Sequence, residues 1–375
     1  MTRVCHLFDR SIGWEQRVSA GQLLGRLPPD RFSQILTGTD GHARSALAPL
    51  GHVVDVVPQR SILAPLAGLG RYLDRQHVDL IHAWGIRAAR CARSACRSAL
   101  VVTCFDPRLS HAESRTLRAV ADRPYPFAVV CASQHVRRRL VEGGVPPQAC
   151  VVLRPAVDFA AITTARRGPL RDELSISRQD FMVVVPEPLT RAGGQIEAVW
   201  ALIVAGINDP FLKVVLPGGS RERERIRRLA ALGLERKTVI CPAVSPAFEE
   251  LVSAADALLV AARGDTSVTS AAWAMAAETV VIGCAGHSLA ELITHKHNGL
   301  LFKRDGKGET ITKIAVLLAD RQGHVSYTEA ARGQAYSVFG LRRFVDQHVQ
   351  LYGNLLTGRP AAEGIVDSAV IGQRL

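Results

Sequence analysis

A short polar segment in the second half of the chain carries side chains suited to binding a phosphorylated sugar. It offers one carboxylate and three hydroxyl groups, on Asp265, Thr266, Ser267 and Thr269. A helix-like run follows directly, from Ser270 to Ala277. Free backbone N–H groups and the positive end of the dipole gather at a helix N-terminus, so this segment can cradle a phosphate or a sugar. Asp265 is a candidate functional carboxylate, and the three hydroxyl residues are candidate ligand-binding groups.

Two buried strands are expected to hold this segment in place. The apolar run Ala257–Val260 precedes it, and the apolar run Val280–Ile282 follows the helix. Strand, polar turn, helix and strand form the repeating unit of a parallel α/β sheet. Ligands of such sheets bind at the carboxyl ends of the strands, where this segment lies. Glu291 opens the next helical run, and we expect it to orient the loop before it.

The same unit recurs along the whole chain. Apolar runs that predict strands lie at Val4–Phe8, Phe32–Leu36, Val53–Val57, Leu80–Ala83, Leu100–Cys104, Ala128–Ala132 and Cys150–Leu153. A second series lies at Phe181–Val185, Phe211–Leu216, Val239–Cys241, Ala257–Val260, Val280–Ile282 and Gly299–Phe302. Helical runs between most of these strands predict two parallel, doubly wound sheets.

The chain is long enough for two domains, and we expect the fold class to be α/β with two Rossmann-like domains. The expected segments are an N-terminal domain at 1–160, a Pro- and Arg-containing linker at 161–178, a C-terminal domain at 179–340, a closing helix at 341–357 and a disordered tail at 358–375.

The second half resembles the nucleotide-sugar domain of GT-B glycosyltransferases, in particular the large retaining group called family 4. The matching segments are Ala274-Met275-Ala276, Glu291-Leu292-Ile293 and Asn298-Gly299-Leu300-Leu301. The two glutamates of the family fall on Asp265 and Trp273. The resemblance implies that Asp265 lies near the transferred sugar, which makes it a candidate catalytic carboxylate, with the three hydroxyl residues beside it as candidate donor-binding groups. Trp273 cannot bind ribose hydroxyls as a glutamate would, so it either stacks on a ring of the donor or fills the core.

The first half resembles the same family at four places, namely Gly13-Trp14-Glu15, Asp79-Leu80-Ile81-His82-Ala83, Val101-Val102-Thr103-Cys104-Phe105-Asp106 and Ser133-Gln134-His135-Val136. The resemblance implies that this half is the acceptor side and that the backbone at Gly13 approaches the donor diphosphate. An ordinary tight turn is the alternative for Gly13.

Three further residues are assigned to the acceptor side. Relatives carry His-Asp where this chain has Phe105-Asp106, and Phe105 cannot exchange a proton. Asp106 is therefore a candidate catalytic residue that positions the acceptor, unless it only caps the turn before Pro107. His82 and Arg87 are candidate acceptor contacts, and a hydrogen-bonded core histidine is the alternative for His82.

Two donor-side loops resemble family motifs that bind the nucleotide. In one, an Arg and a Lys of the family clamp the diphosphate, but Pro188 and Gly193 occupy those positions. Arg191 is then the cation available there, beside Gly194, unless it is a solvated loop residue. In the other loop, Gly218-Gly219 either lets the backbone approach the nucleotide or forms a plain turn.

Composition narrows the protein class. No apolar run approaches the roughly 18 residues of a membrane span, and the N-terminus does not read as a signal peptide, so we expect a cytoplasmic protein. The eight cysteines form no C-x-x-C pair, which predicts free, buried thiols. His287, His295 and His297 lack an acidic partner at ligand spacing, so we expect no metal and no cofactor other than the nucleotide diphosphate sugar as donor substrate.

Charge is concentrated in the first half. Residues 1–175 hold 24 Arg, no Lys and 14 acidic residues, a net charge of +10, whereas the remainder carries +2. An anionic membrane surface, such as the inner face of the membrane, is a candidate partner for Arg87, Arg90, Arg97, Arg137, Arg138 and Arg139. A solvated basic face is the alternative. No nucleic-acid-binding module accompanies the charge, so nucleic acid is not an expected partner.

These observations predict a glycosyltransferase that moves a sugar from a nucleotide diphosphate sugar to an acceptor such as a glycan, a lipid or a small molecule, with retention implied by the resemblance. The alternative is a catalytically silent, glycosyltransferase-like binding protein, because Phe105, Pro188, Gly193 and Trp273 replace functional residues of the family.

Overall fold

The structure is a computed structural model. It describes residues 1–9, 13–39, 47, 54–56, 65–95, 97–106, 109–164, 167–186, 194–207, 209–217, 228, 239–240, 242, 246–261, 267–286, 288–303 and 307–367. The chain divides into two compact units. Unit 1 comprises Met1–Ala156 with Leu341–Leu375, and unit 2 comprises Val157–Gly340.

Unit 1 is built on a seven-stranded parallel sheet. Its strands are β1 (Thr2–Phe8), β2 (Phe32–Gly38), β3 (Val54–Val56), β4 (Leu80–Ala83), β5 (Ala99–Cys104), β6 (Phe127–Cys131) and β7 (Cys150–Val152). They lie in the order β3-β2-β1-β4-β5-β6-β7, and every neighbouring pair is parallel. Because the strand order runs away from β1 in two directions, the sheet is doubly wound.

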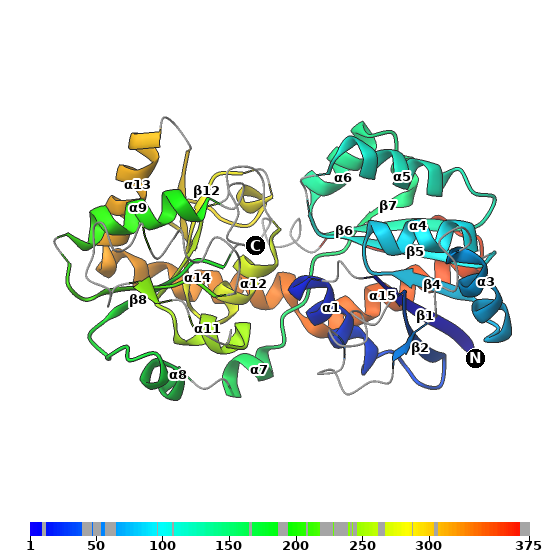
Figure 1. Ribbon diagram of the computed structural model, residues 1–375, viewed down its shortest axis with the longest axis horizontal. Coiled ribbons are helices and arrows are strands. Elements are labelled where there is room, and N and C mark those ends of the chain that lie inside the picture. The colour runs from blue at the N-terminus through cyan, green and yellow to red at the C-terminus, as the bar shows by residue number, and fades with distance from the viewer. Residues whose placement is uncertain are drawn as a thin grey trace. The chain divides into compact units, whose positions relative to one another are not determined.

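Helices flank this sheet (Figure 1). They are α1 (Trp14–Leu24), α3 (Pro65–Arg75), α4 (Ile86–Ala95), α5 (His111–Ala121), α6 (Gln134–Glu142), the 3₁₀ turn η2 (Pro147–Ala149) and α15 (Leu341–Leu356). Alternate strand residues such as Cys5 and Ile81 form one apolar core with α3, α4, α5 and α6. Side chains alternate across a strand, so their neighbours His6 and His82 lie on the opposite face, where Tyr352 of α15 packs.

Unit 2 repeats this plan with six parallel strands. They are β8 (Phe181–Val184), β9 (Leu212–Val215), β10 (Val239–Ile240), β11 (Ala257–Val260), β12 (Val280–Cys284) and β13 (Leu300–Phe302), in the order β10-β9-β8-β11-β12-β13. All neighbouring pairs are parallel. The two doubly wound sheets confirm the predicted fold class, and every predicted strand is present with ends that shift by at most two residues.

The helices of unit 2 are α7 (Phe159–Thr164), α8 (Arg167–Glu173), α9 (Gln195–Gly206), α11 (Phe248–Ala254), α12 (Thr269–Ala276), the 3₁₀ turn η3 (Leu289–Glu291), α13 (Lys307–Ala319) and α14 (Arg321–Phe339). One core joins alternate strand residues, among them Val183 and Leu259, to α9 and α13. Helix α12 packs against both α14 and α11.

The segment that reads as a linker forms two helices instead. Residues 161–178 contain most of α7 and all of α8, and both helices pack on α11 of unit 2. Arg171 explains the difference, because its buried guanidinium donates hydrogen bonds to the carbonyls of Ala254, Ser177 and Asp180 at 2.8, 2.9 and 2.6 Å. A basic residue that looks like part of a solvated linker is an internal anchor of the unit.

The C-terminal segment groups with unit 1. Helix α15 follows Gly340 and places His348 and Tyr352 against the sheet of unit 1. Beyond it, the sequence predicts a disordered tail from residue 358, but the described part of that tail makes specific contacts. Its last described residue, Asp367, forms an ion pair with Arg154 at 2.9 Å.

Candidate functional site

The topology of unit 2 marks one place where a ligand is expected. Strand β8 lies between β9 and β11, so the chain winds one way from β8 to β10 and the other way from β11 to β13. In open parallel sheets, the crevice at the carboxyl ends of two such strands is the usual ligand site, because the following helices diverge there. The residues that follow β8 and β11 are therefore the candidate site of this unit.

Helix α12 begins just after β11 and presents hydroxyl groups at its N-terminus. Ser267 is half-buried and its hydroxyl lies 3.0 Å from that of Thr269, which is 0% exposed. The backbone N–H of Thr269 also donates to Ser267 Oγ at 3.3 Å. Thr269 therefore holds Ser267 in position at the positive end of the helix dipole. Both are sequence-predicted donor residues, and the structure brings them together.

Helix α9 follows β8 on the other side of this point. Its N-cap is Gly194, another predicted donor residue, which adopts a left-handed conformation with φ of 74°. A side chain is rarely tolerated in that conformation. The first residues of the helix, Gln195 and Glu197, are buried. Gly194 and Ser267 thus follow neighbouring strands at the same edge of the sheet, as the sequence predicts.

Close packing fixes the loop that carries Glu291. A Cβ at Gly283 of β12 would lie 2.2 Å from Leu289 Cδ2, so the 3₁₀ turn η3 can approach the strand only because residue 283 is glycine. Glu291 ends η3 and is half-buried. It therefore follows β12, the strand next to β11, but it ends a 3₁₀ turn where the sequence predicts the start of a helix. Its role in orienting the polar segment stays a prediction.

The Asn298-Gly299 pair of the family motif has an internal role. Asn298 Oδ1 accepts a hydrogen bond from Thr294 N at 2.7 Å, and its amide donates to Leu292 O at 2.9 Å. A Cβ at Gly299 would lie 2.9 Å from the carbonyl oxygen of Val281. These two residues brace the chain beside β12 and do not face a ligand.

Trp273 fills the core of unit 2. Its side chain is 3% exposed, and all eight residues of α12 are buried. Of the two interpretations open from the sequence, the structure supports core filling. The position at which similar enzymes carry a glutamate is apolar and enclosed in this protein.

Unit 1 has its own reversal of strand order, between β1 and β4. Gly13 follows β1 as the exposed N-cap of α1, and its N–H donates to Gln16 Oε1 at 3.0 Å. Arg87 follows β4 and is exposed at the start of α4. The two predicted residues therefore flank the reversal point of their sheet, where a ligand of this unit is expected.

His82 is not available to an acceptor, which corrects that expectation. Its side chain is 0% exposed. Nδ1 is hydrogen-bonded to Tyr352 Oη at 2.7 Å and Nε2 to Thr103 Oγ1 at 2.6 Å. Trp84 stacks on its ring with centroids 4.1 Å apart. His82 is the hydrogen-bonded core histidine that the sequence left as the alternative.

A buried aromatic cage surrounds His82, and we call it the histidine cage. Its members are His6, His82, Trp84, Thr103, His348 and Tyr352. Burial lowers the pKa of His82 well below its ordinary value, and it lowers the pKa of His348 to about 4. The neighbouring histidines add to the effect on His82. His82 and His348 are therefore neutral at physiological pH, and the cage holds α15 on the sheet.

The end of β5 carries the remaining acceptor-side candidate. Phe105 is 5% exposed and belongs to the core, whereas Asp106 is exposed directly after it. Cys104 Sγ donates to the carbonyl oxygen of Asp106 at 3.8 Å. Asp106 thus stands at the carboxyl edge of the sheet with Gly13 and Arg87, and its role as a catalytic carboxylate stays a prediction.

Several predicted residues lie outside the described part of the chain. These are Asp265, Thr266, Arg191, Gly218 and Gly219. Pro188, Gly193 and His287 lie outside it as well.

Other features of the described residues bear on the class of site. No group of three His, Cys, Asp or Glu side chains comes together there as a metal ion would require. Six cysteines are described and all are free thiols. None of the described helices is both long and apolar enough to cross a bilayer.

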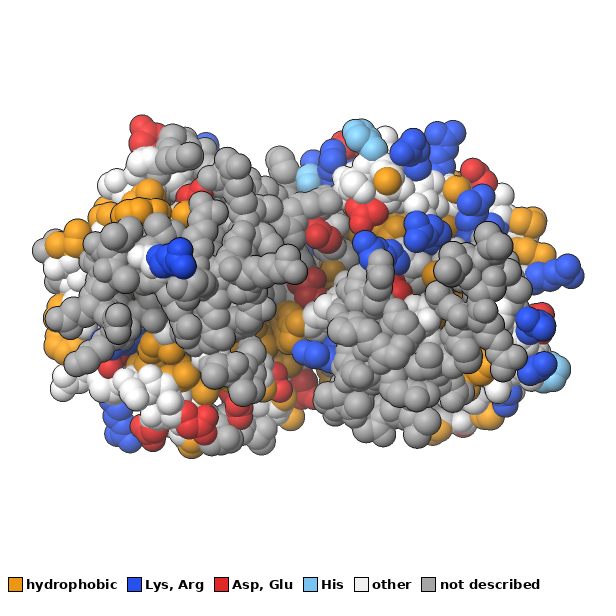
Figure 2. Space-filling view, in the orientation of Figure 1, with side chains coloured by type: hydrophobic (Ala, Val, Ile, Leu, Met, Phe, Trp, Pro, Cys, Tyr) orange, Lys and Arg blue, Asp and Glu red, His pale blue; other side chains and the backbone are white. Residues whose placement is uncertain are grey.

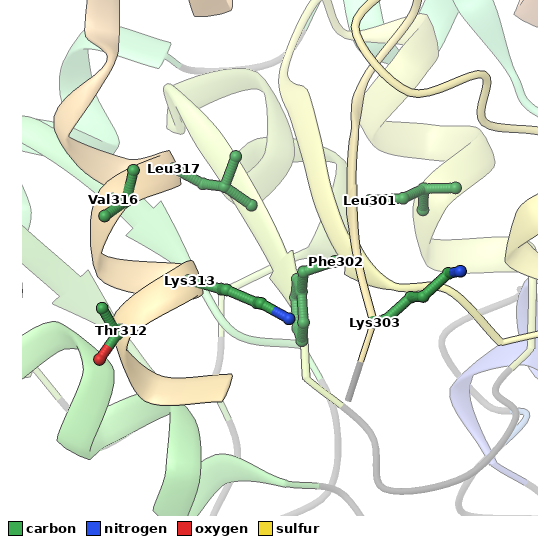
Figure 3. A pocket seen from close by; sticks show the side chains of 7 residues that line it. All are labelled: Leu301, Phe302, Lys303, Thr312, Lys313, Val316 and Leu317. Atoms are coloured by element: carbon green, nitrogen blue, oxygen red, sulfur yellow. The ribbon is translucent and has the colours of Figure 1, made fainter. Parts of the chain in front are cut away.

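A groove of about 340 Å³ lies elsewhere in unit 2, between β13 and α13 (Figure 3). Its lining residues are Leu301, Phe302, Lys303, Thr312, Lys313, Val316 and Leu317. None of them is a site residue predicted from the sequence, and the groove lies at the edge strand, away from the β8–β11 reversal.

Sequence reasoning missed two groups of residues in unit 1. One is the part of the histidine cage on α15, and the other is the ion pair of Arg154 with Asp367. The alternation of His6 and His82 with apolar neighbours in strands was an available signal for a polar inner face. No local signal indicates the partners, because 270 residues separate His82 from Tyr352 and 213 separate Arg154 from Asp367.

Comparison with known proteins agrees with this fold. The family model described as Glycosyl transferases group 1 matches residues 195–320, which contain α9, α11, α12 and α13. Among curated proteins, no sequence matches the chain.

Several solved structures share the fold over nearly the whole chain. HepE of Anabaena, in complex with UDP and glucose, has a TM-score of 0.80 at 19% identity, covering 94% of this chain and 100% of its own. WaaG, a glycosyltransferase involved in lipopolysaccharide biosynthesis, has a TM-score of 0.73 at 14% identity, covering 95% and 100%. Sucrose-phosphate synthase from Thermosynechococcus elongatus has a TM-score of 0.72 at 15% identity, covering 96% and 100%.

The resemblance to GT-B glycosyltransferases is therefore confirmed for the fold. The family match adds support for an enzyme of the transferase type.

Proposed function

We propose that the protein transfers a glycosyl group from a nucleotide diphosphate sugar bound by unit 2 to an acceptor bound by unit 1. The observation that carries this proposal is the β8–β11 reversal point, where the N-termini of α9 and α12 follow neighbouring strands. Helix N-termini stabilise the negative charge of a diphosphate through backbone N–H groups and the helix dipole. The leaving diphosphate gains charge during transfer, so the same groups favour the transition state.

Each candidate residue has a role in this proposal. Gly194 lets the backbone approach the diphosphate, and Ser267 donates its hydroxyl, held in place by Thr269. Asp265 orients the transferred sugar, and Arg191 supplies the cation that Pro188 and Gly193 do not. Asp106, Gly13 and Arg87 belong to the acceptor side. We further propose that transfer proceeds with retention, as the resemblance to the retaining family implies.

A uridine nucleotide is the first donor to test. HepE has been solved with UDP-glucose, at a TM-score of 0.79 and 19% identity to this chain. Titration calorimetry with UDP, UDP-glucose and a guanosine diphosphate sugar should give micromolar binding of one donor. Slow release of the free nucleoside diphosphate should accompany binding when an acceptor or water is present. No binding of any nucleotide diphosphate sugar would refute the proposal.

A catalytically silent binding protein is the second candidate. The burial of Trp273 and Phe105 favours it, because two positions at which similar enzymes carry functional residues belong to the core here. The same titration separates the two candidates. A silent protein binds the donor with a stable heat signal and releases no nucleoside diphosphate over hours, even with a mixture of glycans and lipids as acceptors.

An anionic membrane surface is the proposed partner of the basic face of unit 1. Figure 2 shows basic side chains, all of them arginines in this unit, gathered over α4, α5 and α6. Arg87, Arg90, Arg97 and Arg138 are exposed. Arg137 does not fully join this face, because its Nε donates to Cys150 O at 3.3 Å, and Arg139 pairs with Glu142 at 3.4 Å. Each exposed arginine near an anionic surface contributes roughly 1 kcal/mol.

Vesicle pelleting tests this partner. Vesicles with anionic lipid should retain the protein at low salt and release it at high salt, because screening shortens the range of the attraction. Replacing Arg90 and Arg97 with Gln should reduce retention, whereas Arg332→Gln in unit 2, an exposed residue paired with Glu278, should not. Equal retention by neutral vesicles would contradict an electrostatic surface.

A further inference from the structure

A buried arginine fork lies at the carboxyl edge of the unit 1 sheet. Arg154 follows β7, and Gln134 is the first residue of α6 after the neighbouring strand β6. The Asp367 carboxylate accepts hydrogen bonds from Arg154 Nε and Nη2, both at 2.9 Å, and from Gln134 Nε2 at 2.9 Å. Two parallel N–H donors on one carboxylate make this the bidentate geometry with which arginine binds carboxylates and phosphates.

The fork is enclosed while the tail is in place. The side chain of Arg154 is 1% exposed and that of Asp367 is 6% exposed. A buried guanidinium without an anion is very costly, because desolvation is no longer offset. If the Asp367 carboxylate leaves, Arg154 must therefore gain water or another anion at the same place.

A second guanidinium lies close to this fork. The Arg343 guanidinium lies next to Arg154, since its Nη2 donates to the carbonyls of Arg154 and Pro155 at 3.0 and 3.2 Å. Burial lowers the pKa of Arg343 to about 10, with Arg154 lowering it further and Asp367 opposing the change. Helix α6 also directs the positive end of its dipole toward Gln134. A second guanidinium and a helix N-terminus therefore lie beside the Arg154–Asp367 pair, and both favour an anion at this place.

The segment that supplies the carboxylate is weakly held elsewhere. Between residues 358 and 366, only Ala361 is buried. Its other contacts with α15 are hydrogen bonds. Asn354 Nδ2 donates to Ala361 O at 3.2 Å and to Glu363 O at 2.8 Å, Arg359 N donates to Asn354 O at 2.9 Å, and Gln347 Nε2 donates to Val366 O at 2.8 Å. Little apolar surface must be exposed when this segment detaches, so a competing anion can displace it at modest cost.

We propose that Arg154, Gln134 and the N-terminus of α6 form an oxyanion-binding site, that the Asp367 carboxylate of the C-terminal segment closes it, and that a phosphate-bearing ligand opens it by displacing this segment. The ligand class follows from the bidentate fork, which fits two oxygens of a phosphate, and from the Arg343 guanidinium and the helix N-terminus beside it, which favour an anion of higher charge. The site lies within unit 1, and its existence does not depend on the transferase activity proposed above.

Chemical rescue of a variant tests the site. Asp367→Ala should lower the melting temperature of the full chain by several degrees, because it leaves Arg154 buried without its anion. Millimolar inorganic phosphate should then restore much of the loss, since a ligand that binds only the folded state raises its stability. Sodium chloride at the same ionic strength should not. Asp367→Asn, which keeps the shape of the side chain, provides a second variant in case Asp367→Ala does not fold.

Asp346→Ala is the matched control. Asp346 is also a carboxylate paired with an arginine, Arg342, but this pair is exposed, with side chains 69% and 96% accessible. Neither a loss of stability nor a specific rescue by phosphate is expected for this variant. Failure of phosphate to rescue either Asp367 variant, or equal rescue of Arg154→Gln/Asp367→Ala, would overturn the proposal and leave the ion pair a purely structural contact.

Wild-type protein provides a test without substitution. Inorganic phosphate should accelerate amide hydrogen exchange in residues 358–367, because the ligand displaces that segment, and it should leave exchange in β6 and β7 unchanged. Unchanged exchange at saturating phosphate in the wild-type chain, together with failed rescue, would refute the displacement. Nucleotide binding measured in parallel separates this outcome from a failure of the transferase proposal.

Discussion

The two sheets share one topology but use their central strands differently. In unit 1, the strands at the reversal of order carry His6 and His82, which the histidine cage encloses at 0% exposure. In unit 2, the paired strands carry Val184 and Leu258, and the polar groups come only after the strands end, at Gly194 and Ser267. On the central strands, therefore, polar side chains are internal supports in unit 1, whereas in unit 2 these strands are apolar and the candidate ligand residues follow them.

This difference shows that a residue at a candidate site position can serve either the stability of the fold or the binding of a ligand. His82 matches a family position, yet both its ring nitrogens bond within unit 1, so it stabilises the docking of α15. Ser267 lies at a helix N-terminus, where unsatisfied backbone donors favour an anion. A substitution should therefore reduce stability at the first kind of position and donor affinity at the second.

The largest effect is expected at Trp273, where unit 2 departs most from its relatives. Trp273→Ala should lower the free energy of unfolding by about 3–5 kcal/mol, because it removes a large buried side chain and leaves a cavity. Denaturant unfolding followed by circular dichroism measures this loss. Trp273→Glu, which introduces the residue type of similar enzymes, should be at least as destabilising. If the Trp273→Glu variant unfolds at the same denaturant concentration as the wild type, position 273 is accessible to solvent, and the conclusion that it belongs to the core of unit 2 is wrong.

Acid should weaken unit 1 through its histidine cage. The pKa of His348 falls from 6.5 to about 4 on burial, beside Arg343. Between these two pKa values the unfolded chain binds a proton at His348 that the folded chain does not bind. The contribution of His348 to the free energy of unfolding is therefore complete above pH 6.5 and is lost as the pH falls toward 4. A shift of this size corresponds to on the order of 3 kcal/mol. The lowered pKa of His82 acts in the same direction.

Denaturant unfolding from pH 7 to pH 4 measures this effect. His348→Phe keeps an aromatic ring in the cage and removes the titrating group, so its stability should depend less on pH than that of the wild type. Identical slopes for the two proteins would show that the cage does not titrate and that carboxylates account for the acid response.

The sequence was sufficient for the fold because its signals are local. Short apolar runs alternating with helical runs occur in both halves, and each run needs only its own neighbours to be recognised. The helix anchored by Arg171 was misread because an isolated basic stretch looks the same whether it is solvated or buried. Its partners, the carbonyls of Ala254 and Asp180, are visible only in the folded chain.

The candidate site could be predicted in part for a related reason. Gly194, Ser267 and Thr269 follow strands or begin helices, and parallel topology alone brings such positions to one edge. The assignment of His82 to the acceptor failed because burial depends on α15, which is distant in sequence. The fork of Arg154 and Asp367 was missed for the same reason, since neither residue has a local partner that identifies it.

Two glycine-to-alanine substitutions test how tightly unit 2 holds the η3 turn that contains Glu291. Gly283→Ala should cost about 1–3 kcal/mol, because the new Cβ clashes with buried Leu289 and the turn before Glu291 must shift. Gly353→Ala in α15 of unit 1 is the matched control, because no atom lies within 4 Å of the added Cβ. It should stabilise the protein by about 0.5–1 kcal/mol through helix propensity. A neutral Gly283→Ala would indicate that the loop can move without penalty.

Two hydroxyl substitutions, one in each unit, have the smallest expected effects. They test most directly whether polar side chains serve stability in unit 1 and donor binding in unit 2. Ser267→Ala should weaken donor binding by about 3–10-fold, equivalent to one lost hydrogen bond, and leave the melting temperature unchanged. Thr103→Val should leave donor binding unchanged but lower stability by about 1–3 kcal/mol, because buried His82 Nε2 loses its partner. Ser326→Ala, which removes an exposed hydroxyl on α14, should change neither quantity. If Thr103→Val weakens donor binding as much as Ser267→Ala does, the histidine cage is not a separate internal support, and the division between the two units is wrong.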